Sequence, residues 1–321
     1  MQPPFTLTPK ILTLVAEISL LQGRYEGMHA PVPQPKLRRQ NRVKTIKDSL
    51  AIEGNTLDLD QVTALFEGKR VLGPKQDIKE VQNAIQLYQS LPDLNPAKVN
   101  NLLRAHGILM AGLAKDAGKF RQGAVGILKG QKVSHIAPPT KLVPKLMGEL
   151  FEFLNAKSEL SPLIRACIFH YELEFIHPFS DGNGRMGRFW QSLILSKFHP
   201  AFEYIPVESL IKERQASYYR ILEQCDKKGD STAFIEFSLE TIRDALQDFL
   251  NHLKPTTETP ESRLDFSQKE FEGNEFSRKA YLQLFKTIST ATASRDLAFG
   301  VSDGRLIKTG SQATAKYRFR K

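Results

Sequence analysis

The sequence predicts a mainly α-helical protein with one β-hairpin inside the helical part and a smaller unit at its C-terminal end. Three observations predict this fold class. Apolar residues recur about every third or fourth position along most of residues 6–252, which is typical of amphipathic helices. Residues 119–139 are instead rich in β-forming residues around Gly130 and end in two prolines, which favours a hairpin. Residues 254–264 carry Pro, Thr and Glu with few apolar side chains, as linkers do.

Length and composition place the chain among ordinary globular proteins. It has 321 residues, enough for two or three domains, with 41% hydrophobic and 25% charged residues. This composition excludes a disordered or collagen-like chain, and two cysteines are too few for a disulfide framework. No apolar run reaches the ~18 residues of a membrane span, and the N-terminus lacks the pattern of a secretory signal. We therefore expect a cytoplasmic protein without a membrane partner.

The charge balance favours an anionic partner. The formal net charge is +10, and much of the excess lies in two stretches without acidic residues, 36–47 and 304–321. Basic surface attracts nucleotides, nucleic acids or acidic proteins, although such stretches are also common on plain solvated faces.

Helices are expected before the hairpin at residues 6–29, 43–53, 59–67, around 78–88 and at 95–113. A proline-rich break, residues 30–36, separates the first two. Gly54 is a stop signal for the second helix. Asp58 followed by Gln61 predicts a capping box for the third.

Helices are expected again after the hairpin, at residues 141–155, 162–176, 184–197, 207–225 and 230–252. Ser161 and Pro162 form a good start for the helix 162–176. This helix is apolar around much of its circumference, which predicts a central, buried position. It has to end near Ile176, because Pro178 restricts the residue before it.

The loop after this helix is the most informative part of the chain. It reads His177-Pro-Phe-Ser-Asp181-Gly-Asn-Gly-Arg185-Met-Gly-Arg188. Its glycines let backbone N–H groups approach a ligand, and these amides together with a helix N-terminus form an anion site. Arg185 and Arg188 are three residues apart on the new helix and share one side of it.

The remaining polar residues of the loop complete the chemistry. Asp181 offers Mg²⁺ a carboxylate oxygen, which this metal uses together with phosphate oxygens. His177 titrates near neutral pH and can act as a base. A base, a metal carboxylate, an amide nest and two guanidinium groups within twelve residues indicate nucleotide phosphoryl chemistry.

This loop resembles the signature of the Fic family, HxFx(D/E)GNGRxxR, at every fixed position, and the resemblance extends over roughly residues 40–250. It implies a helical core with a hairpin flap that holds the target segment by strand addition. It also implies transfer of AMP from ATP to a Ser, Thr or Tyr hydroxyl of a target protein or of the enzyme itself. Family members with this layout are often homodimers, but the sequence by itself leaves a homodimer open.

The resemblance assigns roles residue by residue. His177 would be the general base, Asp181 would hold Mg²⁺, and Phe179 would anchor the loop in the core. Arg185 would stabilise the leaving pyrophosphate and Arg188 would bind the γ-phosphate, with Asn183 and Arg188 counted with His177 in the catalytic set. The nucleotide-binding run would be Asp181, Gly182, Asn183, Gly184, Arg185, Met186, Gly187 and Arg188.

Two further segments resemble parts of the same family. Residues 218–226 resemble its adenosine-side helix, which would place Tyr218, Tyr219 and Asp226 near the nucleoside. An aspartate can accept a hydrogen bond from the ribose but cannot donate one, which leaves the base preference open. For Tyr219, plain packing of the helix is the alternative.

The segment Ser49-Leu-Ala-Ile-Glu53-Gly54 resembles the inhibitory motif [ST]xxxE[GN] of this family. Glu53 stands at the C-terminal end of a predicted helix, where a carboxylate opposes the helix dipole. The resemblance implies that Glu53 pairs with Arg188, excludes the γ-phosphate and places the chain in the class with an N-terminal inhibitory helix.

The last residues resemble a winged helix-turn-helix domain. Residues 289–297 are similar to a recognition helix, and residues 304–310 and 317–319 to the two strands of a wing. Arg295 could then face a DNA groove, and Lys316, Arg318 and Arg320 could meet phosphates, whereas dimerisation or target docking is the alternative. The expected domains are a helical region 1–92 with the inhibitory motif, a catalytic core 93–252, a linker 253–266 and a winged helix-like domain 267–321.

We therefore expect a self-inhibited AMP transferase that uses ATP and Mg²⁺. Three alternatives stay open. The chain could be a DNA-binding regulator with a secondary Fic core, it could use another donor such as UTP or a phosphocholine carrier, or it could catalyse the reverse removal of AMP.

Overall fold

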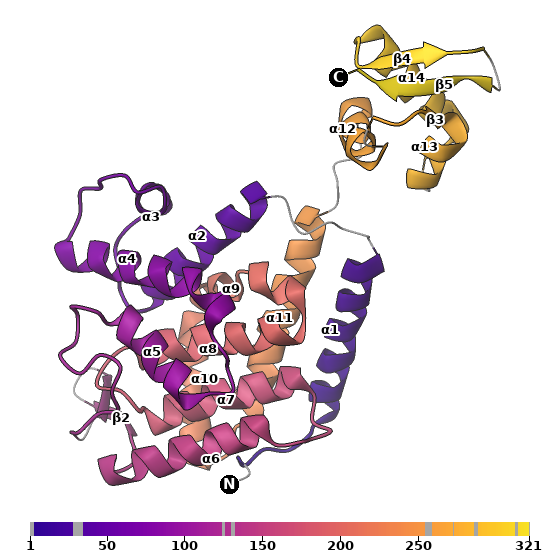
Figure 1. Cartoon of the computed structure of the whole chain (residues 1–321). Coiled ribbons are helices and arrows are strands. Elements are labelled where there is room, and N and C mark those ends of the chain that lie inside the picture. The colour runs from indigo at the N-terminus through magenta and orange to yellow at the C-terminus, as the bar shows by residue number, and fades with distance from the viewer. Residues whose placement is uncertain are drawn as a thin grey trace. The chain divides into compact units, whose positions relative to one another are not determined.

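A computed structural model describes residues 3–27, 35–123, 126–129, 132–253, 259–271, 273–285, 288–311 and 314–320 of the chain (Figure 1). The chain forms two compact units, Met1–Leu250 and Asn251–Lys321. The predicted boundary near residue 92 is therefore not a division between compact units, because the N-terminal helices pack into the same unit as the signature loop.

The larger unit is helical, as predicted. Its helices are α1 Pro9–Gly27, α2 Pro35–Ile52, α3 Leu59–Phe66, α4 Lys75–Gln89, α5 Val99–Leu109, α6 Val143–Asn155, α7 Pro162–Ile176, α8 Asn183–Phe198, α9 Val207–Glu213, α10 Gln215–Lys228 and α11 Thr232–Leu253. Single turns of 3₁₀-helix are η1 Leu91–Asp93, η2 Thr140–Leu142 and η3 Pro200–Tyr204.

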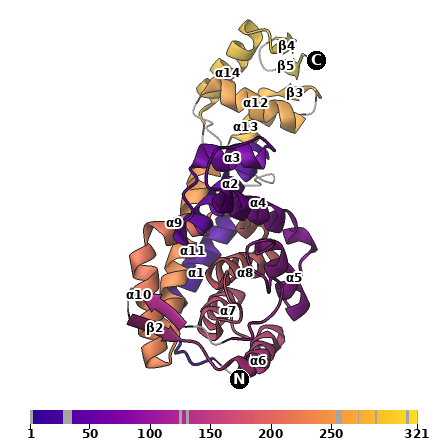
Figure 2. The same ribbon diagram turned by 90° about the vertical axis from the view of Figure 1, so that its left-hand side faces the viewer.

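Helices α7 and α8 pack against each other in the middle of this unit, with the other helices around them (Figures 1 and 2). Cys167, Ile168 and Phe169 of α7 are fully buried, and so is Trp190 of α8. The Ser161 hydroxyl caps α7 by accepting a hydrogen bond from the Leu163 N–H, and α7 ends at Ile176. The predictions of a buried central helix and of its two ends are confirmed.

Several predicted ends differ from the structure. Helix α2 begins at Pro35, well before residue 43, because proline is tolerated in the first turn of a helix. The predicted helix 207–225 is two helices, since Arg214 leaves helical geometry (φ −103°, ψ 22°) and its guanidinium pairs with Asp244 of α11 at 2.6 Å. The capping box of Asp58 and Gln61 on α3 is confirmed.

The predicted hairpin is present as β1 Gly126–Lys129 and β2 Lys132–Ile136, which pair antiparallel with an irregularity between Ile127 and Leu128. Gly130, on which the prediction was centred, lies outside the described residues. The strands are shorter than the predicted range, because residues 119–123 and 137–139 lie outside the pairing.

The smaller unit has the order α12 Pro260–Phe271, β3 Phe276–Ser277, α13 Arg278–Leu284, α14 Thr290–Ser302, β4 Leu306–Thr309 and β5 Lys316–Phe319. Its three strands form a sheet in the order β3-β5-β4. Much of the predicted linker 253–266 is thus helix α12, and Leu264 is fully buried in this unit's core. Helix α12 was not predicted from the sequence, because it begins with Pro and Glu and its apolar residues are too few there to show a helical pattern.

A buried ion pair holds the smaller unit together. Arg263 of α12 donates to both carboxylate oxygens of Asp296 of α14, at 2.5 and 2.6 Å, and Asp296 also accepts from the Tyr281 hydroxyl. Arg263 is 5% exposed and Asp296 1%. The pair therefore fixes α12 to α14 inside the core.

Candidate active site

The predicted site loop joins α7 to α8, and its backbone is specialised. His177 has φ +50°, and it is the only residue other than glycine with a positive φ in the described part of the chain. Gly182, with φ +82°, is the N-cap of α8. The first N–H groups of α8 have no acceptor within the helix, so they point out of its N-terminus toward the space in front of the loop.

The Asn183 side chain closes the loop by hydrogen bonds to Phe179. Its side-chain oxygen accepts from the Phe179 N–H and its side-chain amide donates to the Phe179 carbonyl, both at 2.9 Å. Phe179 is fully buried, as expected. The Asn183 side chain therefore fixes the shape of the loop through both its oxygen and its amide nitrogen.

Two residues that the sequence did not single out also fix this loop. The His106 ring stacks on Phe179, with centroids 3.7 Å apart, and its Nδ1 accepts from the Gly118 N–H. Its Nε2 must then carry the proton that is donated to the Asp181 carbonyl at 3.0 Å. Burial lowers the pKa of His106, which favours this neutral form. A lone histidine in a helix gives no sequence signal for such a role.

Arg121 is the second of these residues. Its Nε donates to the His177 carbonyl at 2.7 Å, and its other nitrogens reach the Gly123 and Pro138 carbonyls. Arg121 thus ties the base of the hairpin to the start of the loop.

The tautomer of His177 follows from a contact with the backbone. Its Nδ1 lies 3.3 Å from the Glu174 carbonyl, which can only accept, so Nδ1 carries the proton. The lone pair is then on Nε2, and the side chain is half-buried.

Arg188 is almost completely buried, with 1% exposure. Its Nη2 donates to Glu53 Oε1 at 2.7 Å and to the Ser49 carbonyl at 3.1 Å, and its Nε donates to the Ser49 hydroxyl at 3.2 Å. Burial by itself lowers the pKa of Arg188, but Glu53, Tyr218 and Glu174 together more than offset it, and the pKa is raised. All three hydrogen bonds come from the predicted inhibitory motif.

The end of α2 explains why this motif has Gly after Glu. The Gly54 N–H bonds to the Ala51 carbonyl and the Asn55 N–H to the Leu50 carbonyl, the two bonds of a Schellman motif. Gly54 has φ +95°, which only glycine adopts without strain. Glu53 is therefore the last residue before a fixed reversal, which directs it toward α8.

Glu53 lies in the space at which the N-terminus of α8 points. A Cβ built on Gly184 would come within 2.5 Å of Glu53 Oε1 and 3.1 Å of Arg188 Nη1. Arg188 Nη1 is buried and has no hydrogen-bond partner among the residues that the structure describes. A carboxylate already lies beside a helix N-terminus and an arginine with donor capacity left, so this site fits an anion such as a phosphate.

Arg185 and Asp181 complete the anion side of the site. Arg185 Nη2 pairs with Asp181 Oδ1 at 3.0 Å, and Arg185 Nη1 lies 3.8 Å from Glu80 Oε1. The Asp181 side chain is 65% exposed. A single exposed carboxylate suits Mg²⁺ that takes its other ligands from water and phosphate. No group of three or more His, Cys, Asp or Glu side chains suited to a metal occurs in the described ranges.

The residues predicted for the nucleoside side differ in exposure. Tyr218 is 1% exposed, and its hydroxyl lies 3.1 Å from His170 Nε2. Its side chain therefore packs in the core against α7. Tyr219 is 38% exposed and contacts the Ile52 carbonyl at 3.5 Å, and Asp226 accepts from the Tyr171 hydroxyl at 3.0 Å.

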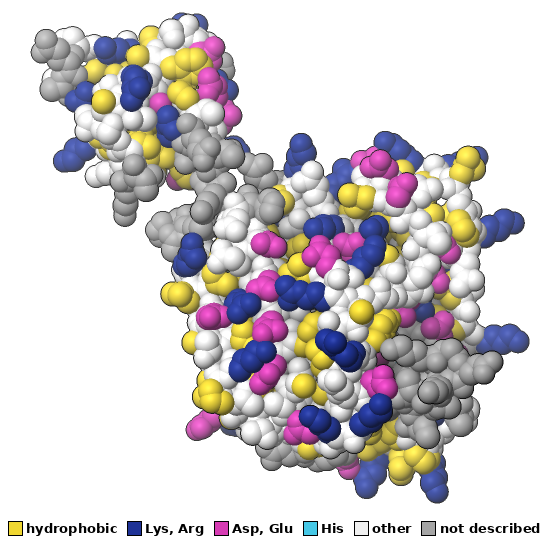
Figure 3. Space-filling view, turned by 180° about the vertical axis from the view of Figure 1, so that it is seen from behind, with side chains coloured by type: hydrophobic (Ala, Val, Ile, Leu, Met, Phe, Trp, Pro, Cys, Tyr) yellow, Lys and Arg dark blue, Asp and Glu magenta, His cyan; other side chains and the backbone are white. Residues whose placement is uncertain are grey.

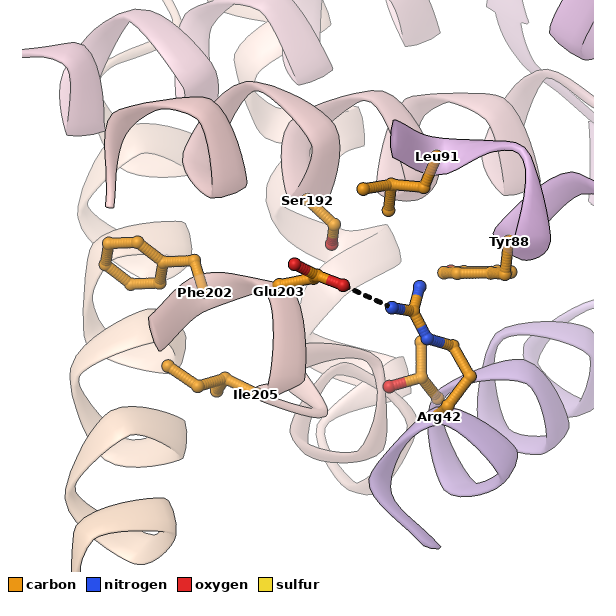
Figure 4. A pocket seen from close by; sticks show the side chains of 8 residues that line it. Arg42, Tyr88, Leu91, Ser192, Phe202, Glu203 and Ile205 are labelled. Atoms are coloured by element: carbon orange, nitrogen blue, oxygen red, sulfur yellow. Dashed lines mark hydrogen bonds and ion pairs between the residues drawn. The ribbon is translucent and has the colours of Figure 1, made fainter. Parts of the chain in front are cut away.

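The cavity beside α2 in Figure 4 is a different feature from this site. Arg42 donates to Glu203 at 3.2 Å across it, and Tyr88 and Ser192 also line it. Its volume is about 10 Å³, enough for about one water molecule. The ion pair therefore anchors the first half of α2 to η3.

Surface charge does not concentrate on the face shown in Figure 3. Over the larger unit, lysine and arginine side chains there are interspersed with aspartate and glutamate side chains. In the part of the chain that the structure describes, no helix has the length and apolar character needed to cross a membrane.

Known proteins with similar sequences and structures indicate the family of this chain. Residues 96–195 match the model of the Fic/DOC family. A crystal structure of a Fic family protein from Desulfovibrio desulfuricans G20 is 41% identical, covers 100% of this chain and 98% of its own, and has a TM-score of 0.75. The chain therefore belongs to the Fic family.

Curated relatives are more distant. The protein adenylyltransferases fic-1 of Caenorhabditis briggsae and Caenorhabditis elegans are each 28% identical over 74% of this chain. The chain spans about half the length of these relatives, 47%. Fic-1 of C. elegans also shares the fold, with a TM-score of 0.65 at 22% identity over 77% of this chain and 74% of that structure.

Proposed function

We propose that this protein is a self-inhibited protein adenylyltransferase that transfers AMP from ATP to a Ser, Thr or Tyr hydroxyl. The observation that carries the proposal is the Glu53 carboxylate, which lies at 2.7 Å from Arg188 in front of the α8 N-terminus. An anion-binding site that is built in this way and blocked by the chain's own carboxylate fits a nucleotide enzyme with a brake. The relatives named as protein adenylyltransferases support the same reaction class.

The proposed reaction forms a bond between the target oxygen and the α-phosphorus of ATP and breaks the bond from that phosphorus to the bridging oxygen, so that pyrophosphate leaves. His177 Nε2 takes the hydroxyl proton. The α8 N–H groups and Arg185 hold the charge that develops on the phosphates. Mg²⁺ on Asp181 would supply charge neutralisation between phosphate oxygens.

Glu53 is the proposed brake. Its contact with Arg188 occupies the donor that the γ-phosphate would use, so ATP cannot settle in the reactive position. Tyr219 and Gln215 of α10 both contact the Ile52 carbonyl, which holds the end of α2 in place. Movement of this helix end would release Arg188.

The test is self-labelling with ATP that carries ³²P at the α-phosphorus, in Mg²⁺, on wild type, Glu53→Gly and His177→Ala. Label in Glu53→Gly that is lost when His177→Ala is added supports the transfer and the brake. Competition by unlabelled UTP as strong as by ATP would favour another donor. Release of AMP from a labelled target by wild type, but not by Glu53→Gly, would favour the reverse reaction.

A second candidate function is DNA binding by the smaller unit, which we propose as a winged helix-like module. Lys316 and Arg318 of β5, and Arg320 directly after this strand, are exposed at alternate positions. Their partners on β4 are not acidic, since Lys316 lies opposite Thr309 and Arg318 opposite Ile307. Lys316 also lies 3.9 Å from the Glu275 carboxylate. Three exposed cations along and directly after a strand favour contact with a phosphate backbone.

The test of DNA binding uses the full chain and a labelled duplex at about 50 and about 200 mM salt. Replacing Lys316, Arg318 and Arg320 by alanine should weaken binding and reduce the salt slope by about 0.9 per lost contact. The matched control replaces three exposed lysines of the larger unit, Lys141, Lys145 and Lys157. Equal losses in both variants would contradict a dedicated DNA surface.

A further inference from the structure

The turn that follows Glu53 is tied to α4 by four hydrogen bonds. The Asn55 side-chain amide donates to the Asp77 carbonyl at 3.1 Å and to Glu80 Oε2 at 2.9 Å. The Thr56 N–H and hydroxyl both donate to Asp77 Oδ2, at 2.8 and 2.6 Å. Helix α4 therefore sets where Glu53 stands.

Glu80 has a second contact that Asp77 lacks among the described residues. Its Oε1, which also accepts from Gln76 at 3.3 Å, lies 3.8 Å from Arg185 Nη1. The side chains of Glu80 and Arg185 are 14% and 7% exposed, so solvent screens this ion pair little. Arg185 Nε is buried without a hydrogen-bond partner in the described ranges.

We propose that Glu80 is a positioning residue that couples the brake to the phosphate site. One carboxylate holds the turn of Glu53 through Asn55 and at the same time faces Arg185. Each signature arginine is thus faced by a carboxylate from another helix, Arg188 by Glu53 and Arg185 by Glu80, and Arg185 also pairs with Asp181 of its own loop. This inference rests on the proposed function, because it takes Arg185 as a phosphate ligand.

The coupling follows from like-charge repulsion. A polyphosphate that binds Arg185 lies next to Glu80 and repels it. If Glu80 stays in place, it weakens binding of the anion. If it moves away, it breaks its hydrogen bond with Asn55 and loosens the turn that follows Glu53. A closed brake and a bound polyphosphate therefore disfavour each other, and this effect is reciprocal.

The first test measures binding by calorimetry in the full chain with His177→Ala, which prevents turnover. Glu80→Gln removes the charge but keeps an oxygen for Asn55. The matched control is Asp77→Asn. It also removes one negative charge from α4 at a residue that binds the turn after Glu53, but Asp77 has no contact with Arg185 among the described residues. ATP with Mg²⁺ and sodium tripolyphosphate are the two probes, because the second carries the charge without a nucleoside.

We expect Glu80→Gln to bind both probes about fivefold more tightly, and Asp77→Asn to stay within about twofold of the parent. Equal shifts in the two variants, or no shift in Glu80→Gln, would overturn the proposal. Tripolyphosphate binding with the expected shift but no ATP binding would leave the coupling standing and contradict the proposed function. Binding of neither probe would overturn both.

The second test is a double-mutant cycle on self-labelling at saturating ATP with His177 intact. Asn55→Ala and Glu80→Ala each remove the tie and should raise the labelling rate severalfold. Glu80→Gln, which keeps the hydrogen bond, should raise it less. The double variant Asn55→Ala/Glu80→Ala should gain less than the product of the two single gains, because both changes remove the same Asn55–Glu80 hydrogen bond, whereas only Asn55→Ala also loses the bond to the Asp77 carbonyl. Additive increases, with unchanged melting temperatures, would contradict the tie.

Discussion

Replacing Glu53 by glutamine tests the brake with the smallest change in shape. Glutamine keeps the length of the side chain and an oxygen near Arg188 but removes the negative charge. Glu53 Oε1 accepts a short hydrogen bond, 2.7 Å, from a guanidinium that is 1% exposed. The Glu53 side chain is 33% exposed, so solvent screens part of the interaction.

The magnitude follows from that contact. A hydrogen bond to a charged group contributes about 1.5–3 kcal/mol, and the partial exposure of Glu53 favours about 2 kcal/mol. If this contact limits access of the γ-phosphate to Arg188, its loss should raise the rate of AMP transfer about 30-fold. The same change leaves a buried cation less well compensated, so the melting temperature should fall.

The assay is the initial rate of self-labelling, measured well below the melting temperature of each variant. Glu67→Gln is the matched control, because Glu67 pairs with Arg39 of the same helix α2 without contacting Arg188. Its labelling rate should match wild type. The reasoning is refuted if Glu53→Gln labels within about twofold of wild type while both proteins accumulate label that depends on His177.

Three further predictions follow from buried groups. Burial and the nearby Asp226 raise the pKa of Glu172 from 4.5 to about 7. The stability that the bound proton provides is therefore fully present below about pH 4.5 and is lost as the pH rises through about 7. Glu172→Gln should match wild type in thermal melting at about pH 4.5 and be more stable at about pH 8, by about 3 kcal/mol, and equal stability at both pH values would contradict this. His106→Ala should lower AMP transfer about tenfold or more by releasing the Asp181 carbonyl, with both units still folded by circular dichroism; an unchanged rate would exclude a positioning role. Arg263→Ala should cost the smaller unit about 3–5 kcal/mol, seen by calorimetry as earlier melting of that unit alone, whereas a shift of both transitions would contradict independent units.

Much of the larger unit could be predicted from the sequence, because helices depend on local signals. The capping box at Asp58, the cap at Ser161 and the stop before Pro178 act over a few residues and are visible as patterns. Helix ends that depend on distant partners could not be predicted. Arg214 breaks a helix where its side chain meets Asp244, and α12 is stabilised by the pair of Arg263 with Asp296, 33 residues apart.

The sequence by itself determined the chemistry of the site. The residue types and spacings from His177 to Arg188 already indicate a phosphate site with a base, since backbone geometry and side-chain chemistry there are local. The resemblance of residues 49–54 to an inhibitory motif also predicted the pair of Glu53 with Arg188, 135 positions apart. Only the tertiary structure decided which other groups face that site, because the contacts of Glu80 with Arg185 and of His106 with Asp181 join residues 105 and 75 positions apart. Such pairs depend on how helices pack, and packing follows from the sum of many buried contacts rather than from any one short pattern.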